Sequence, residues 1–154
     1  MQHKVYCDHP PRARSTGFAH GAEAEIDVGM PGMVFLSAGG YHHHIGLNTW
    51  HSAGGTPPPE GHTGLLHIAI LYPNRRELAK ALKRVLDHGH AFTFAHKTPA
   101  GEAVYLEDPD GNGLELYYDG PREQWIDEEG KPLLNKELFG KLDPKELLEE
   151  LGTA

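Results

Sequence analysis

The order of hydrophobic periodicities in residues 65–119 constrains the fold more than any other feature of this 154-residue chain. The apolar run "LLHIAILY" (65–72) predicts a strand. The segment "RRELAKALKRVLDHG" (75–89) repeats apolar residues at three- and four-residue steps, which is typical of an amphipathic helix that ends at Gly89. Three more strands are predicted, over 91–97, 101–108 and 113–119. The predicted order is therefore β-α-β-β-β.

The first half of the chain is less regular. "QHKVYC" (2–7) predicts a short strand, whereas the prolines and glycines of 8–24 favour irregular structure. The stretch 51–64 contains three consecutive prolines, which cannot continue a β-ladder, and it is predicted to be a linker. Further strands are predicted over 25–29, 33–40 and 41–50, the last two as a hairpin around Gly39-Gly40.

The tail, residues 120–154, is acidic and contains one predicted helix, in "LDPKELLEELG". Asp143 suits the N-cap, Pro144 suits the first helical position, and Glu146 would complete a capping box. We expect this helix to serve packing or dimer formation rather than chemistry.

Composition excludes several classes of function. The formal net charge is −8 and no basic stripe occurs, which argues against a nucleic-acid partner. No stretch approaches the roughly 20 apolar residues of a membrane span, and the start does not resemble a secretory signal. The lone Cys7 excludes an intramolecular disulfide and a cysteine-based zinc site. The cytoplasm is the expected location.

Two features point to chemistry. Glu115 lies between Leu114 and Leu116 in a predicted strand, so it points to the face opposite the two leucines. Either that face is solvated or an internal group needs an anion. The chain also has 12 histidines, a common type of metal ligand, although many will be surface residues.

A β-α-β-β-β unit that ends in "DPDGNGLELY" resembles the vicinal oxygen chelate superfamily of glyoxalases, bleomycin-resistance proteins and extradiol dioxygenases. Over about 33–125 the chain looks most similar to the C-terminal half of catechol 2,3-dioxygenase-type proteins. The resemblance implies an α+β fold in which paired βαβββ modules form a curved mixed sheet around a metal cavity. The modules would span 1–50, in which no segment resembles the family's amphipathic helix, and 65–119, flanked by the linker 51–64 and the tail 120–154.

The resemblance also implies a metal, Fe(II) or alternatively Mn(II) or another divalent ion, held by two histidines and a glutamate. The matching positions are His67 in "LLHIAIL" and Glu115, and the remaining candidate is His3 in "QHKV". Such a set leaves positions open on an octahedral Fe(II) for a catecholate and O2. The alternative is that Glu115 is a solvated strand residue and His67 a hydrogen-bonded core histidine.

Four further residues match substrate-side positions of the extradiol enzymes. In "YHHHIGL" alternation would place His42 and His44 on one side of a strand and His43 on the other. The resemblance favours His44, then His43, as acid–base catalyst. It also implies that Tyr105 and His96 contact the substrate oxygens. Plain surface or core roles stay open for all four. The expected apolar walls are Phe35, Trp50, Phe92 and Phe94.

The resulting hypothesis is a metal-dependent extradiol ring-cleavage dioxygenase that acts on a catechol-type aromatic with O2, expected to be a homodimer. One alternative is a glyoxalase-type lyase, whose sites usually carry a second Glu or a Gln where this chain offers His. The other is a metal-free drug-binding resistance protein of the same superfamily.

Overall fold

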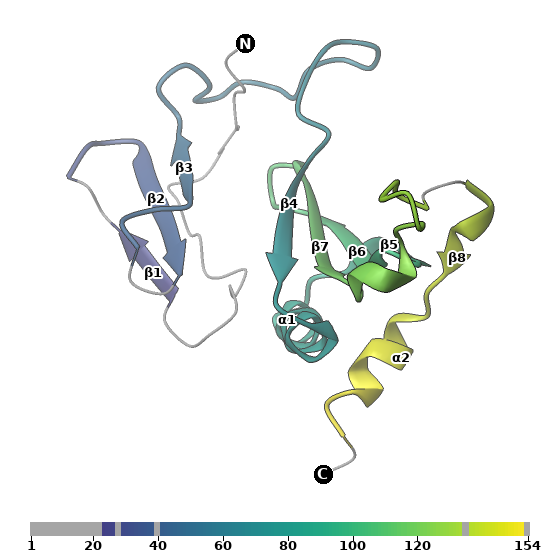
Figure 1. The fold of residues 1–154 in the computed structure, drawn as a ribbon. Helices are drawn as coiled ribbons and strands as arrows, with labels where there is room; N and C mark the ends of the chain where they lie inside the picture. The colour runs from purple at the N-terminus through teal and green to yellow at the C-terminus, as the bar shows by residue number, and fades with distance from the viewer. Residues whose placement is uncertain (1–22, 27–28, 39–40, 134–135, 153–154) are drawn as a thin grey trace. The chain divides into compact units, whose positions relative to one another are not determined.

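A computed structural model describes residues 23–26, 29–38, 41–133 and 136–152 (Figure 1). The described residues form two compact units, one from those within 23–67 and 107–113 and the other from those within 68–106 and 114–152. The predicted strand 2–7 and His3 lie outside the described residues.

The first unit contains a three-stranded antiparallel sheet in the order β1-β2-β3. Strand β1 begins at residue 23, two residues inside the stretch for which irregular structure was predicted, because Glu23 pairs with Ala38 of β2. The linker 51–64 is exposed, apart from Ser52, and contains no helix or strand. The strands are β1 Glu23–Ile26, β2 Met33–Ala38 and β3 Ile45–Asn48.

The predicted β-α-β-β-β order is confirmed, since the five-stranded sheet β4-β7-β6-β5-β8 is accompanied by helix α1 (Figure 1). The fold is of the α+β class, as expected, and both sheets are open. The elements are β4 His67–Tyr72, α1 Arg75–Asp87, β5 Phe92–Thr98, β6 Gly101–Glu107, β7 Gly113–Asp119 and β8 Gly140–Lys141, with 3₁₀ turns at Arg122–Gln124 and Lys136–Leu138.

Local hydrogen bonds explain where α1 begins and ends. The Asn74 side chain accepts from the Glu77 amide at 3.0 Å, which satisfies one of the free donors of the first turn. After the helix, Gly89 adopts a φ of +80°, the left-handed conformation that terminates helices. None of the described helices is long and apolar enough to cross a membrane.

The core of the second unit lies between α1 and one face of the sheet. Its most buried side chains include Leu78 and Leu82 of α1, Val104 of β6 and Leu116 of β7. Side chains of a strand alternate between faces, so neighbours such as Tyr105 and Glu115 project from the other face. We call that second surface the open face. It carries large exposed side chains, among them Leu71 and Phe94.

The tail contributes two elements to this unit. Helix α2, Pro144–Glu149, has Asp143 as its N-cap, whose side chain accepts from the Lys145 amide at 3.0 Å. Instead of completing a capping box, the Glu146 carboxylate lies 3.4 Å from the Lys97 ammonium. Strand β8 was not predicted. It extends the sheet at β5, where His96 pairs with Lys141.

Candidate active site

A hydrogen bond between two neighbouring strands lies at the centre of the open face. The Tyr105 hydroxyl on β6 donates to Oε1 of Glu115 on β7 at 2.5 Å. Burial, reinforced by this bond and by the carboxylate charge, raises the pKa of the Tyr105 phenol well above its ordinary value. The phenol therefore stays protonated and acts as a donor to the carboxylate.

The packing of β7 explains why a carboxylate stands among leucines. Leu114 and Leu116 are both buried in the core, whereas Glu115 is half-buried on the open face. The turn before β7 is held by Asp108, whose Oδ1 accepts from the amides of Asp110 and Asn112 at 2.9 and 2.7 Å. This turn and the pairing of the strands hold Glu115 beside Tyr105.

His96 on β5 extends the polar pair into an aromatic cluster. Its ring stacks on Tyr105, with ring centroids 5.6 Å apart and the planes inclined by 23°. Phe94 and Phe139 lie 5.7 and 5.1 Å from it. Burial lowers the pKa of the His96 imidazole, and the charge of Glu115 opposes that shift only in part. The imidazole is thus favoured in its neutral form, which can accept a proton or a hydrogen bond.

One nitrogen of His96 is chemically uncommitted. Its Nδ1 atom is buried, and no hydrogen-bond partner for it occurs among the described residues. Buried polar atoms are normally paired, so an orphan nitrogen beside a carboxylate–phenol pair suits a ligand atom or water.

His67 is the first residue of β4 and is half-buried in the first unit. Within that unit, Gly113 packs closely against it: a Cβ at position 113 would lie 2.3 Å from the Leu66 carbonyl oxygen and 3.0 Å from the His67 Cβ. Only a glycine fits there. Glu115 is two residues further along β7 and so shares a face of that strand with position 113.

The histidine run departs from the prediction. Strand β3 begins at Ile45, so His42, His43 and His44 precede the strand, and the alternation predicted for these three histidines is wrong. The His44 amide still donates to the Leu36 carbonyl at 2.8 Å, but the Ser37 hydroxyl bonds the Tyr41 carbonyl. The Ser37 side chain thus makes a hydrogen bond here in place of a backbone bond of the β-ladder.

The histidines of the run have different surroundings within the first unit. His43 stacks on Phe35 at 4.0 Å, and its buried Nδ1 has no hydrogen-bond partner in the described part of the chain. His44 Nδ1 lies 3.4 Å from the Ser37 hydroxyl. Ser37 was not predicted from the sequence, although a serine within an apolar strand is a signal that could have identified it.

In the described ranges, no three His, Cys, Asp or Glu side chains gather as a metal site. The candidate ligand His3 is outside those ranges. The Glu115 carboxylate accepts a hydrogen bond from Tyr105, and contacts of this kind orient ligating carboxylates in known metal sites.

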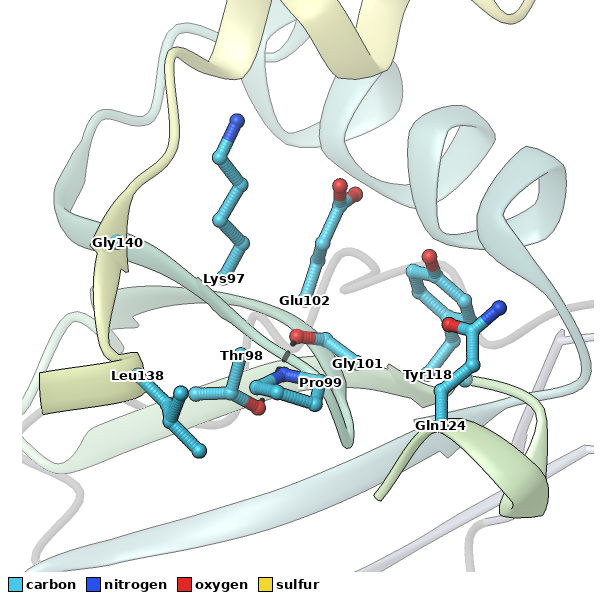
Figure 2. Close-up of a pocket in the computed structure, with 10 residues that line it drawn as sticks. Lys97, Thr98, Pro99, Gly101, Glu102, Tyr118, Gln124, Leu138 and Gly140 are labelled. Carbon is cyan, nitrogen blue, oxygen red and sulfur yellow. Dashed lines mark hydrogen bonds between the residues drawn. The ribbon is translucent and has the colours of Figure 1, made fainter. Parts of the chain in front are cut away.

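A shallow pocket of about 380 Å³ lies elsewhere in the second unit and holds none of the predicted site residues (Figure 2). Lys97 and Glu102, which pair across β5 and β6, both point into it. His96 precedes Lys97 on β5, so alternation places its side chain on the opposite face. The pocket is therefore separate from the aromatic cluster.

Comparison with known proteins identifies the family of the chain. The sequence model of the Glyoxalase/Bleomycin resistance protein/Dioxygenase superfamily matches residues 12–116. The chain belongs to this superfamily.

Among individual proteins, the chain is 45% identical over 96 residues to a catechol-2,3-dioxygenase of Bacillus subtilis (strain 168). The match covers 62% of this chain and 32% of that enzyme, so the chain spans about a third of the relative's length. Hypothetical protein SA1046 from S. aureus shares the fold, with 14% identity, a TM-score of 0.51, and coverage of 77% of this chain and 95% of that one. Lactoylglutathione lyase from Agrobacterium tumefaciens also matches, with 20% identity, a TM-score of 0.46, and coverage of 62% and 75%.

Proposed function

We propose that this protein is a metal-dependent extradiol ring-cleavage dioxygenase acting on a catechol-type aromatic. The observation that carries the proposal is the Tyr105–Glu115 hydrogen bond on the open face, next to His96. A carboxylate, the phenol that donates to it and a neutral imidazole lie within one patch, and an oxygen or nitrogen of each can accept a hydrogen bond from a catechol hydroxyl. The 45% identity to a catechol-2,3-dioxygenase supports the choice of substrate class.

The residues proposed to hold the metal are His67, Glu115 and His3. Imidazole nitrogen and carboxylate oxygen are the ligands of non-haem Fe(II) sites with open positions, so the chemistry of this donor set fits iron. Gly113 supports the assignment of His67, since the missing side chain lets the start of β4, at Leu66 and His67, approach β7 closely. When bound, Fe(II) or an alternative such as Mn(II) supplies Lewis acidity towards the catechol oxygens and the redox chemistry that O2 requires.

The remaining proposed roles belong to side chains of the protein itself. Tyr105 hydrogen-bonds Glu115 and is proposed to orient a substrate hydroxyl. Nδ1 of His96 can accept a hydrogen bond from the same substrate. His44, with His43 as the next candidate, is proposed to take a catechol proton, because an imidazole suits proton transfer near neutral pH. The ring would open between C2 and C3, with both atoms of O2 entering the product.

The proposal is tested on the full chain loaded anaerobically with Fe(II). We expect retained iron and, after addition of catechol and air, a yellow ring-opened product. Retained metal with lyase activity on a glutathione hemithioacetal and no ring cleavage would instead favour a glyoxalase-type enzyme. Failure to retain any divalent metal, with tight binding of an aromatic drug, would favour a resistance-type binding protein.

A further inference from the structure

The C-terminal tail carries an aromatic ring to the candidate active site. Strand β8 pairs with β5 so that His96 lies opposite Lys141 and Lys97 opposite Gly140. Phe139 immediately precedes β8, and its ring centroid lies 5.1 Å from that of His96, with the planes inclined by 41°. A residue 43 positions beyond His96 in the sequence (139 − 96) thus contacts it directly.

His96 consequently has aromatic neighbours in three directions. Tyr105 flanks it on β6, Phe94 precedes it on the same strand, and Phe139 approaches from the β8 side. The side chains of Phe94 and Phe139 are nevertheless 57% and 53% exposed. Large apolar rings that stay exposed beside convergent polar groups are typical of a site that recognises an apolar or aromatic ligand.

We propose that Phe139 is a specificity-determining residue, which packs with Phe94 against the substrate ring and limits the size of its substituents. The inference rests on the proposed function and deepens it, because it assigns a part of the substrate site to the tail. An aromatic ring of the ligand would cover the exposed surfaces of Phe94 and Phe139, while its oxygens reach the Tyr105 and His96 groups.

Buried leucines hold the tail in place. Leu142, directly after β8, and Leu147 of α2 are 1% and 0% exposed. Arg75 of α1 joins α2 to the sheet, since its guanidinium lies 2.8 Å from both Glu102 on β6 and Glu150 after α2. The Arg75–Glu150 pair lies at the surface and contributes little, whereas burial of the two leucines anchors the tail by the hydrophobic effect. Phe139 therefore occupies a defined position rather than a free end.

The test compares Phe139→Ala and Phe139→Leu with Leu138→Ala, a change in the adjacent residue, which lines the pocket of Figure 2 instead. We expect Phe139→Ala to raise KM for catechol roughly 2- to 10-fold, the scale of one aromatic pair, with little change in kcat. Its preference should shift towards catechols with bulkier substituents. Phe139→Leu should give an intermediate KM, and Leu138→Ala should match the wild type.

A second readout is independent of turnover. Carbethoxylation of His96, followed by peptide mass mapping, should be several-fold faster in Phe139→Ala than in the wild type or Leu138→Ala. Equal KM, equal selectivity and equal His96 reactivity in Phe139→Ala would overturn the role of Phe139. Absence of ring cleavage in the wild type would instead contradict the proposed function, and the two failures are thereby distinguished.

Discussion

Tyr105 and Glu115 lie ten residues apart in the chain, yet the phenol of one donates to the carboxylate of the other at 2.5 Å. The intervening turn at Asp108–Asn112 reverses the chain and places β6 and β7 side by side. The bond joins two neighbouring strands on the open face and lies beside the His96 ring.

Replacing Glu115 tests the proposed metal site. We expect Glu115→Ala to abolish retention of Fe(II) while the protein stays folded, because the side chain points away from the core. Metal analysis and circular dichroism measure the two properties. Asp119→Ala, at the exposed end of the same strand, is the control and should keep its iron. Full iron content in Glu115→Ala would remove the central assignment.

Tyr105→Phe should change the alkaline behaviour of the protein. A phenol whose pKa is raised in the folded state keeps its proton while the unfolded chain loses it, so stability falls as pH rises through about 10. We expect the variant to lose this part of the alkaline decline and to be about 1 kcal/mol less stable near neutral pH. Denaturant unfolding at a series of pH values measures the stability, and phenolate absorbance measures the titration of the tyrosine. An unchanged titration would contradict the assigned bond.

His96 should contribute to loss of stability in acid. Because its pKa is lowered in the folded state, the unfolded chain binds more protons as pH falls below about 6.5, and the free energy of unfolding decreases until the folded-state pKa is reached. His96→Gln should make this decline shallower. The same substitution at the exposed His62 is the control. Identical pH profiles for wild type and His96→Gln would exclude a buried imidazole at this position.

His44→Ala tests the proposed acid–base catalyst. We expect normal iron content and at least 10²-fold slower ring cleavage, the usual scale of a general acid–base contribution. His42→Ala, in the same run, should keep its turnover. If His44→Ala is as active as wild type while His43→Ala is slow, the base is His43 instead.

Gly113→Ala tests the close approach of β7, at Gly113, to the start of β4, at His67. The added methyl group would meet the Leu66 carbonyl, so the start of β4 must shift, at a cost of about 1–3 kcal/mol and with reduced iron retention. At Gly111 a Cβ meets open space, but φ is +80°. Gly111→Ala should therefore lose about 1 kcal/mol and keep its iron. Equal iron content in both variants would contradict the role of Gly113.

The sequence by itself determined the β-α-β-β-β order and the side of β7 from which Glu115 projects. Those properties depend on local periodicity: apolar spacing distinguishes helix from strand, and alternation assigns each side chain to a face. The spacing of Tyr105 and Glu115 across the hairpin could also be recognised in the sequence, because the turn between them sets the register of the two strands.

The tertiary structure decided what periodicity could not. Strand β8 is two residues long, too short for a pattern, and its pairing with β5 depends on Leu142 and Leu147 burying against the rest of the unit. That packing brings Phe139 to His96. The histidine run likewise lies outside the strand predicted for it, and the Ser37 side chain bonds the Tyr41 carbonyl there. Contacts between residues distant in sequence form only where burial elsewhere holds the chain, and no local pattern encodes them.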